Sequence, residues 1–465
     1  MRNKNFHRFY ERIEENPPFK ENLVIWIGLR ASDNSLIRFM KPEMVISTHH
    51  SKDCSFMEER LPVFSSEKDV KMRTDSNLSD LDPYLGEIVS FLSSFKEVSS
   101  YLVCYHSTPG LEHMVKRHPN IKILNPPAKL KVFLDRKSIV RKELKKRGVR
   151  TIPGLEARLS PEVFAYAIQE CGLPLVVQFD NSASGNGSYL IEKDTEFHEL
   201  CMQYPQRLAT IMKHIDGKSL NINAVRTRNF VVVSEPSLQI IGQQECTSRR
   251  FGYCGNDFNI GSKLSDEQVS DSMNITQTVG NWLGDLEYYG IFGVDLLADS
   301  DHVYFVELNP RFQGSTALLT DRQIEMGKIP LSLFHIVPYL DGIAVEPSFI
   351  AEYNRFRVPL NVSQILLHNI SGRDQQVIRS VTPGRYSIEN DFLHYLGPAR
   401  FLSETRSYDE LLIQETPEAG TTLLKESDEI CRISTYKDVL APNGKDLNEY
   451  GRELVRKVST SFQLR

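Results

Sequence analysis

The sequence has no excess of positive charge and no long apolar run. It contains 55 lysines and arginines against 60 aspartates and glutamates, a formal net charge of −5. A nucleic-acid-binding protein needs basic surface to neutralise phosphates, so this balance argues against a nucleic-acid partner. No apolar segment reaches the length of a signal-peptide core or of a membrane span, which argues against a membrane partner. We therefore expect a cytoplasmic protein.

Several common site motifs are also missing. The seven cysteines are scattered and none forms a Cys-x-x-Cys pair, so neither a disulfide framework nor a zinc site is indicated. The N-terminal part lacks Gly-x-Gly-x-x-Gly, so a dinucleotide site there is not indicated. No Ser-His-Asp or Cys-His arrangement is apparent.

Apolar runs and helical patterns divide the chain into three regions. Apolar runs separated by a helical pattern predict an open α/β domain over residues 1–130. Mixed patterns predict an α+β region over 131–340, with a smaller part of it at about 150–225, and a small α+β region over 341–465. The predicted fold class is therefore α/β followed by α+β.

End signals place the main elements of the second region. Asp135 can cap a basic helix that ends at Gly148, and Ser160-Pro161 can open a helix that ends at Gly172. Between and after these helices, four apolar segments predict strands: 173–179, 188–191, 293–297 and 303–308.

Two of these strands each carry one acidic residue where a hydrophobic residue would be expected. These residues are Asp295 and Glu307, and Asn309 follows Glu307 by two, so it faces the same side of an extended chain. Two carboxylates and an amide oxygen suit a hard cation such as Mg²⁺. Arg311 could stabilise charge on a transferring phosphoryl group or an acyl oxyanion. The alternative is a buried Glu–Arg pair that closes a strand end.

The segment 307–315, Glu-Leu-Asn-Pro-Arg-Phe-Gln-Gly-Ser, resembles the metal-binding signature of the ATP-grasp superfamily. The resemblance implies a pre-ATP-grasp domain followed by an ATP-grasp fold of two α+β subdomains, one of them a lid, with ATP and Mg²⁺ (or Mn²⁺) as cofactors. It also implies that Asp295, Glu307 and Asn309 bind the metal and that Arg311 is catalytic.

The same resemblance implies an ATP site upstream. Lys137 lies eleven residues before Gly148, where the superfamily usually has its first nucleotide-binding lysine; the alternative is a solvated lysine on a basic helix face. A small-residue loop lies between two predicted strands, and its backbone amides can close over phosphates, although an ordinary hairpin turn would look similar. The superfamily usually has a second lysine on the strand entering this loop, where this chain has an amide. The implied loop contacts are Gln178, Ser184, Gly185 and Gly187.

The segment 211–217 resembles the hinge against which adenine packs. Backbone groups from Lys213 to Ile215 would read the adenine edge, and Met212 or Ile215 would cover its face. A plain strand end is the alternative. The acidic residue often found after the hinge glycine is missing, since Lys218 follows Gly217, so ribose recognition is unassigned.

The overall layout is similar to ligases of amino-acid and peptide natural-product pathways, a group that includes the pheganomycin peptide ligase and the butirosin glutamyl–carrier-protein ligase. This resemblance implies that ATP activates an amino-acid or peptide carboxylate as an acyl phosphate, which passes to an amine or to the thiol of an acyl or peptidyl carrier protein. A catalytically weakened ATP-binding module is the alternative. A biotin-dependent carboxylase is disfavoured because no Met-Lys-Met acceptor segment is present. Arg249 or Arg250 could hold a substrate carboxylate, or could lie on an exposed loop.

Overall fold

The computed structural model describes the chain from residue 22 onward, apart from short gaps. The described ranges are 22–35, 44–58, 62–70, 78–94, 99–180, 187–340, 345–390, 392–420 and 422–465. None of the helices in these ranges is both long and apolar enough to cross a membrane.

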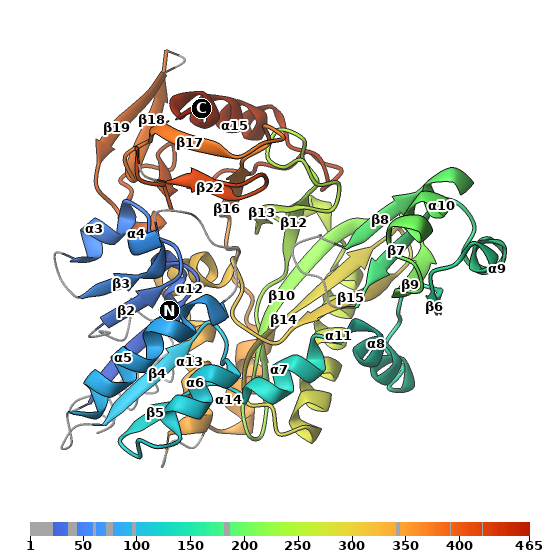
Figure 1. Cartoon of the computed structure of the whole chain (residues 1–465), viewed down its shortest axis with the longest axis horizontal. Helices are drawn as coiled ribbons and strands as arrows, with labels where there is room; N and C mark the ends of the chain where they lie inside the picture. The colour runs from blue at the N-terminus through green and yellow to red at the C-terminus, as the bar shows by residue number, and fades with distance from the viewer. Residues whose placement is uncertain are drawn as a thin grey trace.

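A five-stranded parallel sheet forms the N-terminal part of the molecule (Figure 1). Its order is β3-β2-β1-β4-β5, and the central strands β1 and β4 are almost wholly buried, which explains their continuous apolar sequences. The chain first adds strands on one side of β1 and then, from β4 onward, on the other. The elements are β1 (Leu23–Gly28), β2 (Met44–Ser47), α3 (Asp53–Glu58), β3 (Val63–Ser65), α4 (Ser66–Val70), α5 (Asp82–Ser93), β4 (Ser100–Cys104), α6 (Pro109–Val115) and β5 (Ile121–Ile123).

An eleven-stranded sheet, antiparallel throughout, forms the centre and the C-terminal part of the molecule. Its order is β15-β14-β10-β12-β13-β16-β22-β20-β18-β19, with β11 paired to β10. One sheet therefore runs across the predicted boundary at residue 340. Its strands are β10 (Lys218–Arg226), β11 (Val231–Val233), β12 (Ser237–Ile241), β13 (Tyr253–Asp257), β14 (Gly290–Ala298), β15 (Val303–Asn309), β16 (Ser363–His368), β18 (Gly384–Glu389), β19 (Phe392–Gly397), β20 (Leu411–Gln414) and β22 (Glu429–Thr435).

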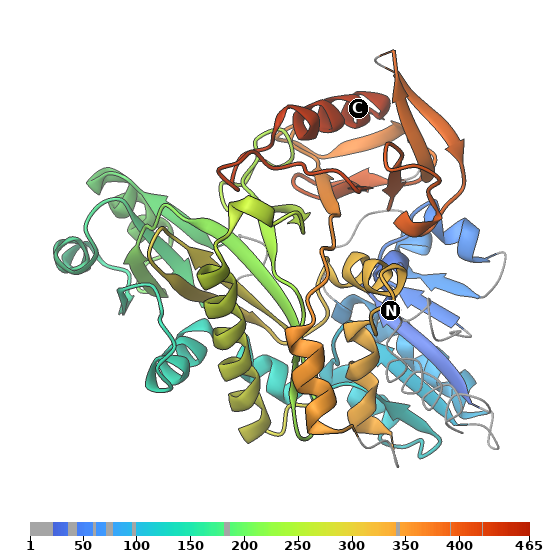
Figure 2. The ribbon, with the colours of Figure 1, turned by 180° about the vertical axis from the view of Figure 1, so that it is seen from behind.

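Helices cover this sheet. The long α11 runs along β10 and β11 (Figure 2), and it begins with a capping box between Ser265 and Gln268. Helices α12, α13 and α14 follow the edge strand β15 and share an apolar core with the N-terminal sheet. Helix α13 also lies against β10 and β14. The helices are α11 (Asp266–Asp285), α12 (Thr316–Glu325), α13 (Leu331–Ile336), α14 (Pro347–Arg355) and α15 (Glu449–Ser461); a small sheet joins β17 (Gln375–Arg379), β21 (Leu423–Leu424) and β23 (Gln463–Leu464).

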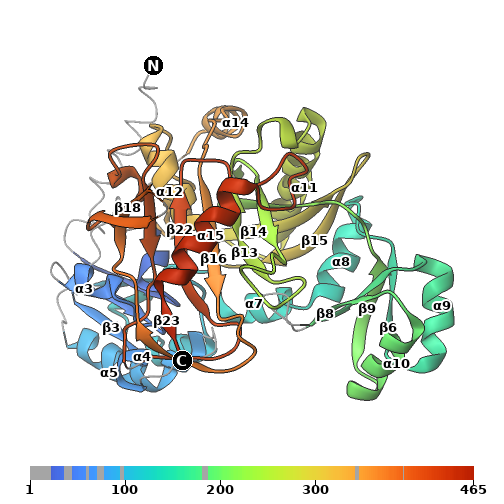
Figure 3. The same ribbon diagram turned by 90° about the horizontal axis from the view of Figure 1, so that it is seen from above.

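A separate four-stranded antiparallel sheet projects from the rest of the molecule (Figure 3). It has its own apolar core, centred on Phe179 and Phe197. Its α9 begins at Pro161, as predicted, and ends at Gly172, whose φ of 71° explains the glycine. We call this unit the lid: β6 (Gly154–Arg158), α9 (Pro161–Cys171), β7 (Leu175–Phe179), β8 (Ser188–Ile191), α10 (Asp194–Gln203) and β9 (Leu208–Lys213).

The predicted cap of the basic helix is wrong. Asp135 ends α7 (Ala128–Leu134) and pairs with Lys131 at 2.6 Å, while α8 (Lys137–Lys146) begins after Arg136 without a side-chain cap of its own. The carboxylate at the start of α8 comes from the lid: Asp180 accepts hydrogen bonds from the Ser138 backbone N–H at 2.8 Å and from its Oγ–H at 2.6 Å. A local pattern cannot reveal a cap that lies 42 residues away.

A closed ring of four charged residues joins the N-terminal sheet to the C-terminal strands. Arg30 and Asp33 follow β1, and Glu429 and Arg432 lie on β22. Glu429 contacts Arg30 at 2.6 Å and Arg432 at 2.7 Å, while Asp33 contacts Arg432 at 2.7 Å and Arg30 at 3.7 Å. All four residues are buried. Burial alone would raise the pKa of Glu429, but Arg30 and Arg432 outweigh it and lower that pKa to about 2.

This low pKa predicts a loss of stability in acid. Because the folded pKa of Glu429 lies below the ordinary 4.5, the unfolded state binds the proton more readily, so the stabilisation is complete above pH 4.5 and is lost as the pH falls toward 2. The shift corresponds to about 3 kcal/mol. Denaturant unfolding of wild type and Glu429→Gln across pH 2–6 measures it: their stability difference should shrink as the pH falls through this window, and a pH-independent difference would contradict the prediction.

Candidate active site

One large cavity of about 1310 Å³ opens between the lid, the eleven-stranded sheet and the N-terminal sheet. Its size exceeds that of typical small-molecule pockets and leaves room for more than one ligand. Ten lysines and arginines but only six aspartates and glutamates line it, although the whole chain carries a net charge of −5. This local positive excess suits anionic ligands.

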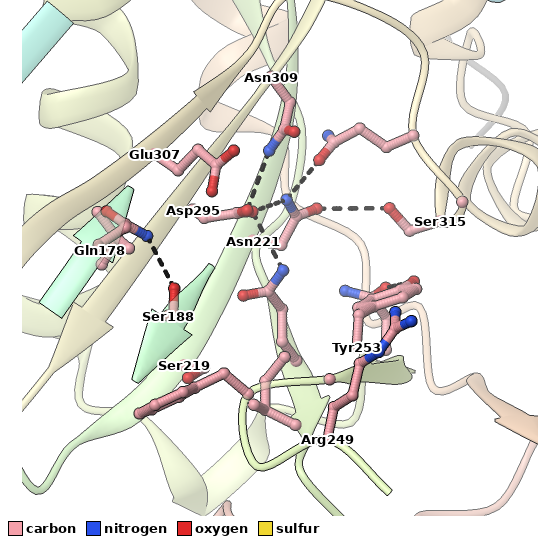
Figure 4. Close-up of a pocket in the computed structure, with 18 of the residues that line it drawn as sticks. Gln178, Ser188, Ser219, Asn221, Arg249, Tyr253, Asp295, Glu307, Asn309 and Ser315 are labelled. Carbon is pink, nitrogen blue, oxygen red and sulfur yellow. Dashed lines mark hydrogen bonds between the residues drawn. The ribbon is translucent and has the colours of Figure 1, made fainter. Parts of the chain in front are cut away.

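The two acidic residues singled out in the sequence face each other in this cavity. Strands β14 and β15 are antiparallel, and Asp295 is the direct partner of Glu307, while Gly293 is the partner of Asn309. Figure 4 shows the three polar side chains of this group converging. The strand register thus brings together the predicted metal ligands Asp295, Glu307 and Asn309.

The Asp295 carboxylate is buried and held by three side-chain amides. Oδ1 accepts from Asn221 at 2.6 Å and from Gln239 at 3.1 Å, and Oδ2 accepts from Asn309 at 2.9 Å. Burial, and then the charge of Glu307, raises the pKa of Asp295 to about 6. Two carboxylates that repel each other in this way would both be stabilised by a cation bound between them.

Magnesium fits the carboxylates of this site. In the described part of the chain there is no group of three or more His, Cys, Asp or Glu side chains that could hold a metal alone, so further ligands would come from phosphate oxygens and water, as Mg²⁺ often arranges. Asn309 directs its amide nitrogen to Asp295 and its oxygen to Arg311 at 3.1 Å. Coordination through that oxygen would require Asn309 to release Arg311.

Lys137 does not lie on a solvated helix face. Its side chain is 8% exposed, lines the cavity and contacts Glu307 at 3.1 Å. The first residue of α8 therefore points inward, beside the acidic pair.

Strand β15 ends at Asn309, before Arg311, yet Arg311 still lines the cavity. Its guanidinium donates from Nη1 to the Tyr105 phenol at 2.8 Å and to the Phe312 carbonyl at 3.0 Å. Arg311 thus connects the end of β15 to the residue that follows β4 in the N-terminal sheet.

Part of the loop that was predicted to contact phosphate lies in the lid and borders the cavity. Gln178 is buried there and donates to the Ser188 hydroxyl at 3.3 Å, while its Oε1 has no hydrogen-bond partner among the described residues. The Gly187 carbonyl accepts from the Phe179 amide at 2.8 Å, which closes the base of the hairpin. The other two predicted loop residues, Ser184 and Gly185, lie outside the described ranges.

The predicted hinge residues Met212, Lys213 and Ile215 all line the cavity. The Lys213 amide donates to the Pro153 carbonyl at 3.0 Å, and the His214 amide donates to that of Pro174 at 3.2 Å. Among the backbone amides of Lys213, His214 and Ile215, only that of Ile215 has no hydrogen-bond acceptor in the described structure.

Sequence reasoning missed the polar residues that support Asp295. Asn221 donates to both Asp295 and Gln313, and Asn223 donates to Ser315. The available signal was their spacing: Asn221 and Asn223 alternate with apolar residues in β10, so they share a face of the sheet. Both arginines considered for substrate binding line the cavity. Arg249 lies beside Tyr253 (Figure 4), and Arg250 is 64% exposed and lies 3.7 Å from Glu192 of the lid.

Two α+β units around one cavity, with carboxylates on neighbouring antiparallel strands, define an ATP-grasp fold, and the predicted fold class is confirmed. Residues 137–315 match the family model described as an ATP-grasp domain. This match places the central part of the chain in the ATP-grasp superfamily.

Two kinds of known protein are similar in sequence. The formate-dependent phosphoribosylglycinamide formyltransferase of Francisella tularensis subsp. novicida (strain U112) is 23% identical over 280 residues, which cover 54% of this chain and 69% of the relative. Biotin carboxylase 1, chloroplastic, of Populus trichocarpa is 27% identical over 212 residues, or 42% of this chain and 38% of the relative.

Solved structures are similar over nearly the whole chain. The biotin carboxylase domain of Hydrogenobacter thermophilus 2-oxoglutarate carboxylase, in complex with MgADP, ADP and bicarbonate, has a TM-score of 0.58 at 13% identity and covers 96% of this chain and 91% of its own. N5-carboxyaminoimidazole synthase of Aspergillus clavatus has a TM-score of 0.55 at 11% identity, covering 95% and 99%. At these identities the likeness concerns the fold.

Proposed function

We propose that this protein is an ATP-dependent ligase that activates an amino-acid or peptide carboxylate and transfers the acyl group to an amine. The observation that carries the proposal is the cluster of Asp295, Glu307 and Lys137 in one cavity: two carboxylates paired across neighbouring strands, with an ammonium 3.1 Å from one of them. Such a cluster can bind a divalent cation and a polyphosphate together.

The proposed nucleotide site runs from strands β14 and β15, which carry the proposed metal ligands, to the lid. Adenine would lie against Met212 and donate to or accept from the backbone of Lys213 and Ile215, with the Ile215 amide as its available donor. Lys137 and Gln178 would contact phosphate. The lid loop would cover the phosphates with the backbone of Ser184, Gly185 and Gly187.

The proposed reaction has two steps. In the first, a carboxylate oxygen attacks the γ-phosphorus, the bond to the β,γ-bridging oxygen breaks, and ADP leaves with the electron pair. In the second, the amine nitrogen attacks the acyl carbon, the bond from that carbon to the phosphate oxygen breaks, phosphate leaves, and the nitrogen loses a proton to solvent. Bound Mg²⁺ would neutralise phosphate charge. Arg311, beside the acidic pair, would stabilise the acyl oxyanion.

The similar proteins support a carboxylate as acyl donor. One is by name a formate-dependent formyltransferase acting on phosphoribosylglycinamide, an amine, and the Aspergillus clavatus enzyme was solved with ADP and 5-aminoimidazole ribonucleotide, also an amine. The choice of an amino acid as donor and of natural-product biosynthesis as context rests on the sequence resemblance alone, as does a carrier-protein thiol as another acceptor.

A screen for ADP and phosphate release tests the function. The protein is assayed with ATP and MgCl₂ or MnCl₂ and each proteinogenic L-amino acid, singly and in pairs. Release with free amino acids supports the amine ligase. If ADP and phosphate are released only after a phosphopantetheine carrier protein is added, the acceptor is a thiol and not an amine. If ATP binds but is not turned over under any condition, the protein is an ATP-binding module and not a ligase.

Lys137→Ala is expected to raise the KM for ATP about tenfold, because the ammonium next to Glu307 would no longer offset phosphate charge. Steady-state kinetics at saturating MgCl₂ measures this value. Lys146→Ala is a matched control on the same helix, since Lys146 is exposed and pairs only with Glu143 among the described residues. An unchanged KM for ATP in Lys137→Ala would remove Lys137 from the proposed site.

A further inference from the structure

A second group of apolar side chains lines the cavity, in addition to Met212 and Ile215 of the proposed adenine site. It comes from β12, from β16 and from the hairpin that joins β12 to β13, and we call it the apolar patch. None of its members belongs to the three apolar cores of the described residues. Leu366 is buried, and the other three are partly exposed. The members are Ile241, Phe251, Tyr253 and Leu366.

Strand alternation turns two of these side chains toward the cavity. Ile365 and Leu367 flank Leu366 in β16 and pack in an apolar core. Ile240, next to Ile241 in β12, packs in the same core. Successive side chains of a strand point to opposite faces of the sheet. Leu366 and Ile241 therefore point away from that core and into the cavity.

A β-bulge turns Tyr253 to the same side. Gln239 of β12 is the strand partner of Asn256. Two residues later, Ile241 is the partner of Tyr253, which lies three residues before Asn256, so β13 has one extra residue. Gly255 supplies the backbone for it, with a φ of 126°. The bulge brings Tyr253 and Asn256 onto one face, where the Tyr253 hydroxyl donates to Asn256 Oδ1.

The apolar patch lies next to the proposed metal carboxylates. Gln239 donates to Asp295 at 3.1 Å. Residues directly opposite on neighbouring strands have Cβ atoms about 5 Å apart, so Asn256, the strand partner of Gln239, is close to this carboxylate. Because Tyr253 donates to Asn256, the apolar patch borders the site where the acyl phosphate would form.

The same hairpin carries a cation. Arg249 lies beside Tyr253 in the cavity wall (Figure 4). Backbone hydrogen bonds hold its loop: the Gly242 amide donates to the Gly252 carbonyl at 2.8 Å, and the Gly252 amide donates to that of Arg249 at 2.9 Å. Strands β14 and β10 lie between this hairpin and β15, which precedes Arg311. The cavity therefore has two arginines that come from different parts of the sheet.

An apolar surface beside a guanidinium matches an amino acid with a large apolar side chain. We infer that the apolar patch binds the side chain of the acceptor amino acid and that Arg249 binds its carboxylate. This inference rests on the proposed function, because it names the amine that attacks the acyl phosphate. The donor's carboxylate becomes the acyl group, so a carboxylate that stays free throughout the reaction belongs to the acceptor. A guanidinium can bind it with two parallel hydrogen bonds.

The test fixes the acyl donor and varies the acceptor, using the full chain with ATP and MgCl₂. Hydroxylamine serves first as acceptor, because it has neither a side chain nor a carboxylate, and the hydroxamate that it forms identifies the donor. With that donor, and after subtraction of the rate with donor alone, leucine, methionine and phenylalanine are compared with glycine and glutamate. The apolar acceptors should have a kcat/KM about ten- to a hundredfold higher, the scale of burying a large apolar side chain.

Variants separate the two parts of the subsite. Ile241→Ala and Phe251→Ala should each lower kcat/KM for leucine about tenfold and leave hydroxamate formation within twofold of wild type. Arg249→Met should lower kcat/KM for leucine about ten- to a hundredfold, as expected for a lost hydrogen bond between charged groups. The same variant should leave kcat/KM unchanged for leucinamide, which has no carboxylate. Arg379→Met is the control: Arg379 is exposed on β17 and does not line the cavity, so this variant should behave as wild type.

Equal kcat/KM for leucine and glycine in the wild type, or unchanged values for leucine in all three variants, would overturn this subsite and leave the ligase function standing. Hydroxamate formation without transfer to any free amino acid would do the same. An equal loss of hydroxamate formation in the variants would also overturn it, because the residues would then act on the nucleotide or the donor. If the wild type releases no ADP and forms no hydroxamate with every amino acid, the proposed function fails and this inference fails with it.

Discussion

Replacing Glu307 by glutamine should lower Mg²⁺-dependent ADP release by about a thousandfold, the scale of losing a principal charge-stabilising group in a transition state. The substitution keeps the shape of the side chain and removes the negative charge that faces Asp295 and Lys137. The divalent ion would lose the Glu307 carboxylate and keep that of Asp295. The ion would then no longer hold the ATP triphosphate in position for attack by the substrate. Steady-state ADP release over a range of MgCl₂ concentrations measures the loss.

Glu325→Gln is a matched control for this prediction. Glu325 is 31% exposed in its side chain against 26% for Glu307, and it too pairs with a cation, Arg322 at 2.8 Å, but it does not line the cavity. Asn309→Ala should also abolish turnover, since it removes the donor to Asp295 and the acceptor for Arg311. Wild-type turnover by both Glu307→Gln and Asn309→Ala would remove the proposed metal site.

Replacing Arg432 by methionine should lower the free energy of unfolding by about 3–5 kcal/mol, the range for removing one partner of a buried ion pair. The guanidinium contacts Asp33 and Glu429 at 2.7 Å each. Without it, the one basic partner left to Asp33 among the described residues would be the more distant Arg30, at 3.7 Å. Because the ring joins β22 to the end of β1, the contact between the C-terminal strands and the N-terminal sheet would weaken. Denaturant unfolding at neutral pH measures the change.

Arg147→Met is the comparison for an exposed pair. Arg147 lies at the end of α8, is one-third exposed in its side chain and contacts Glu143 and Asp285 at 3.2 and 3.5 Å. Its loss should cost under about 1 kcal/mol. A cost for Arg432→Met no larger than this would mean that the buried ring does not hold the two parts together.

The sequence predicted best where the physical cause is local. The limits of α9 arise from Pro161 and Gly172 themselves, and they lie where predicted, since α9 runs from Pro161 to Cys171 and Gly172 follows it. Asp295 and Glu307 stood out because each interrupts an apolar strand, and the antiparallel pairing of β14 and β15 sets them opposite each other.

Predictions failed or were missing where the partner is distant. The start of α8 is capped by Asp180 of the lid and not by the nearby Asp135. The strands after residue 340 extend the central sheet because β16 pairs with β13, and no local pattern specifies that pairing. Asn221 donates to Asp295, which lies 74 residues away in the chain, and to Gln313, which lies 92 residues away.

By itself, the sequence determined the strands that carry Asp295 and Glu307, the ends of α9 and the types of residue available for cation and phosphate chemistry, since these follow from side-chain periodicity and composition. Only the tertiary structure decided which groups meet. Arg311 contacts Tyr105 across 206 residues of chain, and Arg432 contacts Asp33 across 399. Strand register and the packing of the domains bring these residues together, and both depend on interactions between residues that are distant in the sequence.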